Sequence, residues 1–266
     1  MNLFRWAGTI AILRASTKKL VANGYLLLHG KKMENNENHV SSGSFLKFAA
    51  PVLTLILGKL AAFGFMTHVA AAVPNQPTSL AAHQIILSLF FFISPFLEVM
   101  SQTGQTFLPQ FYQNAEWDDS ANRLALRMLR LGMIVGAGVS CIAGSIPRFF
   151  PGLLTKDKMI WDAVFPLAAP LVVSGMLTAP VAVSEGVLLA RRELKFLASV
   201  YLVSTALLPS VLMKIKRNGS PSGVVQVWTC FAAFQLFRAI CFTGKLWGRR
   251  LLRRILNLGQ SKTEKA

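Results

Sequence analysis

Five ionisable side chains interrupt the long apolar runs of this sequence. They are Lys59, His83, Glu98, Glu185 and Arg238. If these runs cross a membrane, each charge near the bilayer centre costs about 2.5–3.5 kcal/mol, so such residues are usually paired or face a water-filled path. A carboxyl group in that setting can take up and release a proton, and a basic group can contact an anion. The pattern therefore indicates a site that handles protons or anions.

The two acidic residues have different surroundings. Glu98 is followed by Gln102 and Gln105 at i+4 and i+7, so the three share one face of a helix. A carboxylate beside two amides can coordinate a cation, hold a proton or bind a polar substrate. The same side chains could instead only fasten helices together. Glu185 lies deep in its run, where it could exchange a proton near neutral pH or pair permanently with a basic group.

The basic residues also leave alternatives open. Lys59 is too deep in its run to reach the interface easily, so we expect it to meet an anion in a water-filled cavity or to be neutralised by Glu98 or Glu185. Arg238 is nine residues from the end of its run, from where a long side chain could reach the interface. His83 could relay a proton or form a structural hydrogen bond.

The elements that must position these residues are membrane helices. The chain has 266 residues, 53% of them hydrophobic and only 15% charged, with a mean hydropathy of +0.48. A single soluble core does not need so much apolar surface. Six runs reach the length of about 20 residues that a transmembrane helix needs. We place them near 49–73, 80–112, 126–150, 163–189, 195–213 and 223–247. The predicted fold is therefore an all-α polytopic membrane helix bundle of about six helices, with a loop over 110–119.

The net charge of +17 is that of loops rather than of a nucleic-acid surface, because the basic residues cluster between the apolar runs. With six spans, 20 of the 28 Lys and Arg lie on the side of the two termini and 6 on the other, and the remaining two, Lys59 and Arg238, lie inside spans. The positive-inside rule then places both termini on the cytoplasmic or stromal side.

Three segments are expected along the chain. Residues 1–44 contain an apolar stretch at 7–13 that is too short to span, interpreted as the remnant of a truncated helix, followed by a polar basic linker. Residues 45–247 form the helical lobe, and the basic amphipathic tail at 248–266 could lie on an anionic membrane surface. Motifs for ATP binding or hydrolysis are not found, and the three cysteines lack metal-ligand spacing. We therefore predict no enzyme, no cofactor and no metal site.

Several motifs carry a family resemblance. The segment SLAAHQI at 79–85 resembles the stretch that opens the eighth helix of multidrug and toxic compound extrusion (MATE) transporters. Further matches follow in the family's order, covering about residues 45–247: Ala49-Ala50-Pro51 at the start of its seventh helix, Gly104-Gln105 at the end of its eighth, Leu154-Thr155-Lys156-Asp157 before its tenth and Glu185-Gly186-Val187 late in its tenth.

The resemblance implies a fold and a transport activity. MATE transporters have two six-helix lobes around a central cavity, and they exchange organic substrates for protons or sodium ions by rocking between inward-open and outward-open states. This chain resembles the second lobe. The plastid and organic-acid branch of the family has acidic residues where Glu98 and Glu185 stand. The sodium-coupled bacterial branch has a glutamate eight residues after the proline that Pro51 matches, and here Lys59 stands there. This difference argues against sodium and for anion handling.

We therefore expect a MATE-type secondary antiporter that exports organic compounds or organic anions in exchange for protons, or for sodium ions. The expected coupling residues are Glu98 and Glu185, and the expected substrate-cavity residues are Lys59, His83, Gln84, Gln102 and Gln105. The alternatives are a truncated half-unit that does not transport without a partner lobe, and a flippase-like lipid carrier. The expected partners are membrane lipids, a small organic substrate, a coupling cation, and either an N-terminal lobe or a second copy. The branch favours a plastid envelope, with the plasma or vacuolar membrane as alternatives.

Overall fold

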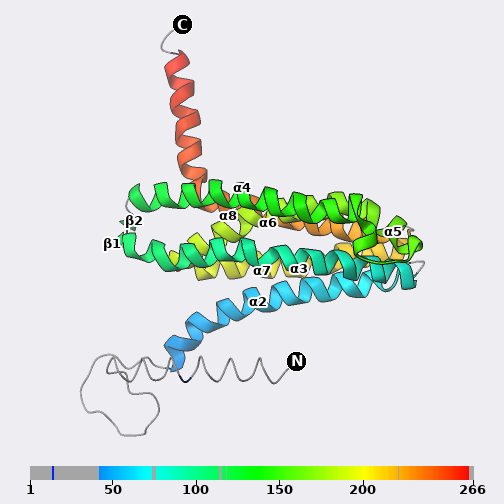
Figure 1. Ribbon diagram of the computed structural model, residues 1–266. Helices are drawn as coiled ribbons and strands as arrows, with labels where there is room; N and C mark the ends of the chain where they lie inside the picture. Colours follow the sequence, from blue (N-terminus) through cyan, green and yellow to red (C-terminus); the bar gives the residue numbers. More distant parts are fainter. Residues whose placement is uncertain are drawn as a thin grey trace. The chain divides into compact units, whose positions relative to one another are not determined.

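The computed structural model describes residues 14, 42–73, 76–113, 116, 117, 119–220 and 222–263. The predicted helix remnant at 7–13 lies outside them, as does most of the linker that follows. Residues 46–266 form one compact unit, in which most of the long helices lie side by side (Figure 1). The helices are α2 (Ser42–Ala70), α3 (Gln76–Phe107), α4 (Asp119–Phe149), α5 (Lys158–Val164), α6 (Ala168–Ala190), α7 (Leu194–Asn218) and α8 (Gly223–Thr263). Three short 3-10 helices connect them: η1 (Leu108–Phe111), η2 (Pro151–Leu153) and η3 (Phe165–Leu167).

Six helical stretches in the described part of the chain are long and apolar enough to cross a bilayer. They are Ala49–Ala70, Pro77–Phe111, Ser120–Phe149, Lys158–Ala190, Leu194–Asn218 and Gly223–Gly248. Each overlaps one of the six apolar runs, and the fourth joins α5, η3 and α6 into one span. The predicted all-helical membrane fold is confirmed.

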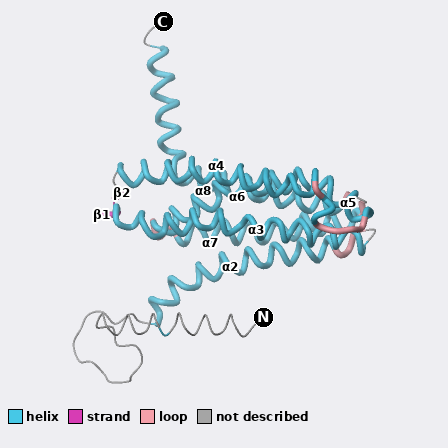
Figure 2. The backbone as a smooth tube through the Cα atoms, in the orientation of Figure 1, coloured by secondary structure: helices cyan, strands magenta, loops and turns pink. Residues whose placement is uncertain are grey.

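The connection between α3 and α4 differs from the prediction. Instead of a plain loop over 110–119, η1 continues to Phe111, and two short strands follow, β1 (Tyr112–Gln113) and β2 (Glu116–Trp117). The strands pair in antiparallel register, Tyr112 with Trp117 and Gln113 with Glu116. They lie at one end of the bundle, where β1 and β2 are labelled in Figure 2. A connection of only two residues brings the backbone groups of the two arms within reach of each other, so they pair. The loop prediction is wrong for these residues.

Helix α6 lies at the centre of the bundle, where it packs against α3, α4 and α8. Small residues allow this close approach, as in other membrane helix pairs. A Cβ atom on Gly175 of α6 would collide with the Ser140 side chain of α4. Gly186 of α6 lies against the backbone of Ser101 in α3, and a Cβ atom added to Gly104 of α3 would lie 3.5 Å from the carbonyl carbon of Gly186. These contacts fix the distance between α3 and α6.

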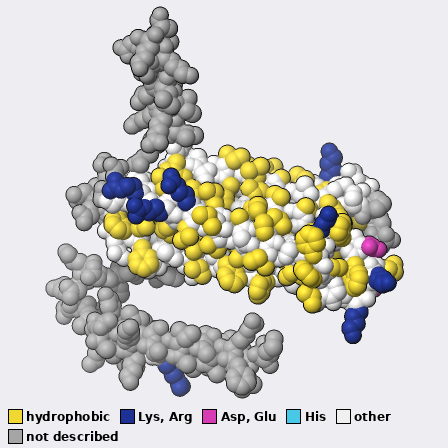
Figure 3. All heavy atoms as spheres, turned by 45° about the horizontal axis from the view of Figure 1, so that its top comes forward, with side chains coloured by type: hydrophobic (Ala, Val, Ile, Leu, Met, Phe, Trp, Pro, Cys, Tyr) yellow, Lys and Arg dark blue, Asp and Glu magenta, His cyan; other side chains and the backbone are white. Residues whose placement is uncertain are grey.

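The surface of the bundle is strongly apolar over its middle. Figure 3 shows hydrophobic side chains over the central part of one face, with Lys and Arg gathered toward its two ends. Large side chains such as Leu60, Phe92, Ile134, Ile142 and Leu202 are more than half exposed. A soluble monomer rarely exposes so continuous an apolar surface, whereas lipid tails would cover it at no cost.

Candidate functional site

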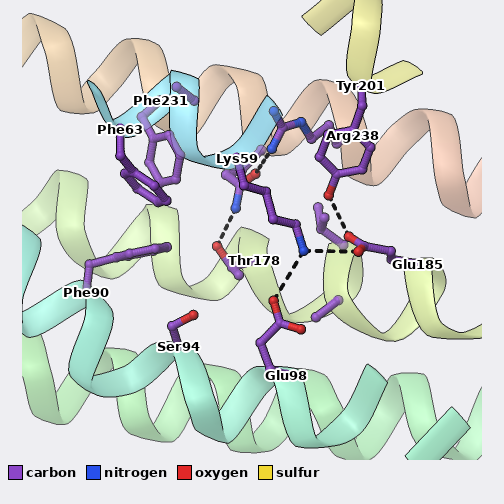
Figure 4. Close-up of a pocket in the computed structure, with 14 residues that line it drawn as sticks. Lys59, Phe63, Phe90, Ser94, Glu98, Thr178, Glu185, Tyr201, Phe231 and Arg238 are labelled. Atoms are coloured by element: carbon purple, nitrogen blue, oxygen red, sulfur yellow. Dashed lines mark hydrogen bonds and ion pairs between the residues drawn. The ribbon is translucent and has the colours of Figure 1, made fainter. Parts of the chain in front are cut away.

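One lysine bridges two carboxylates in the middle of the bundle. Lys59 Nζ, on α2, lies 3.3 Å from Glu98 Oε1 on α3 and 3.0 Å from Glu185 Oε1 on α6 (Figure 4). Lys59 is near the centre of the span Ala49–Ala70, with roughly 15 Å of helix rise on either side at 1.5 Å per residue. Its alkyl chain is too short to carry the ammonium to an interface. The two neutralising partners that the sequence offered as alternatives for Lys59 therefore contact it together.

Helices α7 and α8 complete the site with hydrogen bonds. The Tyr201 hydroxyl donates to Glu185 Oε2 at 2.5 Å. Arg238 stacks on the Tyr201 ring, with its guanidinium carbon 4.6 Å from the ring centre. The guanidinium also donates to Ser204 Oγ and to Gln235 Oε1, both at 3.4 Å. The suggestion that Arg238 could reach the interface is wrong, because the residue is 4% exposed and is held by these contacts.

The charges in the site balance one another. Lys59 and Arg238 supply two positive charges, and Glu98 and Glu185 supply two negative charges. Isolated ions are expensive to bury, and paired ions with additional hydrogen bonds much less so. The arrangement therefore explains how four ionisable groups are accommodated within membrane-spanning helices. The balance also means that the gain of one proton or one ion changes the net charge of the site.

The site opens gradually from inside to outside. The Glu185 side chain is 7% exposed, that of Lys59 is 34% exposed and that of Glu98 is 43% exposed. Glu185 is therefore the inner acid, and Glu98 is the outer acid. Because exposed charges in the middle of a span are rare in lipid, the outer side of this site must face water or another protein segment.

The cavity beside these groups is small. Its volume is about 60 Å³, enough for a few water molecules, since a cavity needs about 10–15 Å³ to hold one. Pockets for drug-sized compounds usually measure about 300–1,000 Å³. Phe63, Phe90 and Phe231 form an aromatic wall at one side (Figure 4), and the ring centres of Phe90 and Phe231 lie 5.3 Å apart. The cavity thus has room for water, a proton or a small ion, and not for a whole organic substrate.

His83 is placed outside this cavity. The residue is fully buried. Its Nδ1 accepts a hydrogen bond from Trp228 Nε1 at 3.2 Å, and its Nε2 lies 3.1 Å from Thr67 Oγ1. Because an indole N–H can only donate, Nδ1 must be unprotonated, and Nε2 of the neutral ring can then donate to Thr67. His83 therefore joins α2, α3 and α8 through hydrogen bonds, as the structural alternative for this residue described.

The indole of Trp228 tests this structural role. We expect Trp228→Phe to lower the free energy of unfolding by about 1–3 kcal/mol, because it leaves the buried His83 Nδ1 without a donor. Thermal unfolding of the purified chain in detergent measures the change. Trp247→Phe is the matched control: the indole N–H of Trp247 has no hydrogen-bond partner among the described residues, so its loss should cost clearly less. Equal losses in the two variants would contradict the role.

The three glutamines of the predicted cavity lie elsewhere. Gln84, Gln102 and Gln105 are exposed on α3, and none of them lines the cavity. Gln105 Nε2 donates to Ser101 Oγ on its own helix at 3.2 Å. They thus face outward from this bundle, along the same helix that carries Glu98.

Four polar residues of the cavity were not predicted from the sequence: Ser94, Thr178, Tyr201 and Gln235. Gln235 Nε2 donates to Thr178 Oγ1 at 2.6 Å, which connects α8 to α6. A search for every polar residue inside the apolar runs, in addition to charged ones, would have found them. Among the residues that the structure describes, no group of three or more His, Cys, Asp or Glu side chains lies close enough to hold a metal ion.

Comparison with known proteins agrees with the motifs. No family model matches the chain, and no solved structure matches it. "Protein DETOXIFICATION 47, chloroplastic" from Arabidopsis thaliana is 30% identical over 271 aligned residues, covering 97% of this chain and 46% of the relative. The chain is homologous to the plant DETOXIFICATION proteins of the MATE family. "Protein DETOXIFICATION 44, chloroplastic" from the same plant is 23% identical, covering 78% of this chain and 39% of the relative.

This homology confirms the family inferred from the ordered motifs. The MATE family is a family of transporters, so the prediction that the chain is not an enzyme is also confirmed. The chain spans about half the length of the curated relatives that it matches. Two of the ordered motifs also meet in the structure, because Gly104 of the Gly-Gln step packs on Gly186 of the acidic-Gly-Val step.

Proposed function

We propose that this chain is one lobe of a MATE-type secondary antiporter, which exports organic compounds or organic anions in exchange for protons. The observation that carries the proposal is the bridge from Lys59, near the centre of its span, to Glu98 and Glu185 on two other apolar helices. Ionisable groups placed in this way mark substrate or proton pathways in membrane proteins. In this role Glu98 and Glu185 are the proton-linked carboxylates, and Lys59 contacts the anion or compensates the charge.

Protons fit this site better than sodium ions do. A hard metal cation binds through several oxygen ligands arranged around it. Here the position between the two carboxylates is taken by the Lys59 ammonium, and the second oxygen of Glu185 accepts from Tyr201. A sodium ion would have to displace Lys59 and would add to the positive charge already present. A proton needs only one free carboxylate oxygen.

The size of the cavity supports a second lobe. A volume of about 60 Å³ cannot hold a typical organic substrate, so the substrate would bind on the open side of the site, between this bundle and another. Gln84, Gln102 and Gln105 lie exposed on α3 and could line such a space. The second lobe would be an N-terminal lobe or a second copy of the chain. Its placement in a plastid envelope, with both termini on the stromal side, belongs to the same proposal.

The share of the relatives that the chain covers favours the half-unit among the alternatives. Because the chain covers 46% of DETOXIFICATION 47, it could be a half-unit that does not transport without its partner. A half-unit needs a different lobe to complete the substrate cavity, whereas an assembly of copies completes the cavity with this chain alone.

Proton-driven flux in vesicles tests the proposal. The chain is reconstituted alone and together with the part of DETOXIFICATION 47 that it does not match, and a proton gradient is imposed. We expect uptake of at least one labelled compound from a panel of monocarboxylates, dicarboxylates and tetraethylammonium, with no uptake under a sodium gradient alone. Uptake only with the added part identifies a half-unit, and uptake by the chain alone identifies an assembly of copies. No gradient-driven uptake in either preparation would contradict the proposal.

A further inference from the structure

We infer that the two acids have different roles: Glu98 exchanges its proton with water, whereas Glu185 and Lys59 form a fixed internal ion pair. The inference rests on the proposed function only in naming this proton as the coupling proton. The assignment itself concerns which carboxyl group gains and loses a proton, and it can be tested without a substrate or a second lobe.

Both oxygens of Glu185 are already occupied by donors. Oε1 accepts from Lys59 Nζ at 3.0 Å, and Oε2 accepts from the Tyr201 hydroxyl at 2.5 Å. The side chain is almost completely buried. A proton could be added to Glu185 only if one of these two donors left its oxygen, and a buried donor without an acceptor is costly. Tyr201 is itself held by the stacked guanidinium of Arg238, so this end of the site is fixed.

Glu98 lacks such restraints. Its contact with Lys59 is longer, at 3.3 Å, and involves only Oε1. Within the described ranges, no other side chain donates to its Oε2. The Glu98 side chain is also the most exposed of the three, at 43%. If Glu98 takes up a proton, Lys59 keeps its shorter contact with Glu185, so no charge is left unpaired by the change.

Protonation of Glu98 has a defined electrostatic consequence. The charged or titratable groups that line the cavity with it are Lys59 from α2, Glu185 from α6, Tyr201 from α7 and Arg238 from α8. With both acids ionised the site is neutral, and with Glu98 protonated it carries one positive charge. The side of the Lys59 ammonium that faced Glu98 is then free to bind an anionic group. Proton uptake and anion binding would therefore favour each other at this position.

The order of protonation tests the inference. The full chain is purified into lipid nanodiscs, and the carbonyl stretch of protonated carboxyl groups is followed by infrared difference spectroscopy while the pH is lowered. Subtraction of the Glu98→Gln spectra isolates Glu98, and subtraction of the Glu185→Gln spectra isolates Glu185. We expect the Glu98 band to appear at a higher pH than any Glu185 band. A Glu185 band that appears first, or together with that of Glu98, would overturn the inference.

A double variant protects the test against misfolding. Glu185→Gln alone leaves Lys59 without its inner partner, whereas Lys59→Gln combined with Glu185→Gln removes the whole pair. In this double variant the Glu98 band should persist, and adding Glu98→Gln should abolish it. Loss of the band in the double variant would overturn the inference. Because the readout is independent of transport, an absence of proton-driven flux beside the expected order of protonation would reject the proposed function alone.

Discussion

Glu185→Gln should reduce proton-coupled transport by the complete carrier to the level of vesicles without protein. The substitution keeps the shape of the side chain and removes its charge, so Lys59 loses its 3.0 Å partner. The ammonium then has Glu98 as its one carboxylate among the described residues that line the cavity. That outer acid would be held in its ionised form and could not take up the coupling proton. Initial rates of uptake under an imposed proton gradient measure the loss.

Glu193→Gln is the matched control for this experiment. Glu193 also forms an ion pair, with Lys245 at 3.6 Å, but this pair lies where α7 begins and outside the cavity. Exposed pairs of this kind contribute only about 0.2–1 kcal/mol, so the control variant should fold and transport like the unchanged protein. Elution of each variant as one symmetric peak in size-exclusion chromatography shows that it is folded. Unchanged proton coupling in folded Glu185→Gln would remove Glu185 from the site.

The six helices could be predicted because lipid imposes strict requirements on sequence. Each span must be apolar over about 20 residues and must satisfy its own backbone hydrogen bonds, and both requirements are visible in one dimension. The family was also predictable, because several short motifs occur in the family's order. The strands after η1 were not, since segments of two residues are too short to show the alternation of a strand.

The sequence identified the charged residues of the site, but it did not show which of them contact one another. A charge inside an apolar run marks Lys59, Glu98 and Glu185 as unusual. Lys59 is separated from the two acids by 39 and 126 residues, and their meeting depends on the rotation of each helix, which is set by packing. Tyr201 was missed because an aromatic residue in an apolar run cannot be distinguished by sequence from a residue of the hydrophobic core. Its hydroxyl becomes informative only beside Glu185.

The helical period correctly placed three polar residues on one face of α3, but it did not show which of them contact other helices. Glu98, Gln102 and Gln105 do follow one side of α3, yet only Glu98 lies against the other helices of the cavity. The role of His83 also could not be decided from the sequence. Its position in an apolar run allowed a relay or a structural bond, and the choice depends on Trp228, which is 145 residues away.

The separation of the two acids is set by the contact between α3 and α6, so Gly186→Ala should damage both stability and the site. A Cβ atom on Gly186 would collide with the O, Cα and C atoms of Ser101. A backbone cannot rotate away as a side chain can, so the helices must move apart. Overpacking of this kind typically costs about 1–3 kcal/mol, and we expect a loss at the upper end of that range.

The same displacement would pull Glu185 away from Glu98, since Glu185 precedes Gly186 directly and Glu98 lies one turn before Ser101. Thermal unfolding of the purified chain in detergent measures the loss. Gly138→Ala is the matched control, because Gly138 lies inside the span Ser120–Phe149 and a Cβ atom added there would have no described neighbour within 4 Å. That variant should be unchanged or more stable, by up to about 1 kcal/mol, since alanine favours a helix over glycine. Equal melting temperatures for the two variants would show that α3 and α6 can separate freely, and the fixed geometry assumed for the ion bridge would then be untenable.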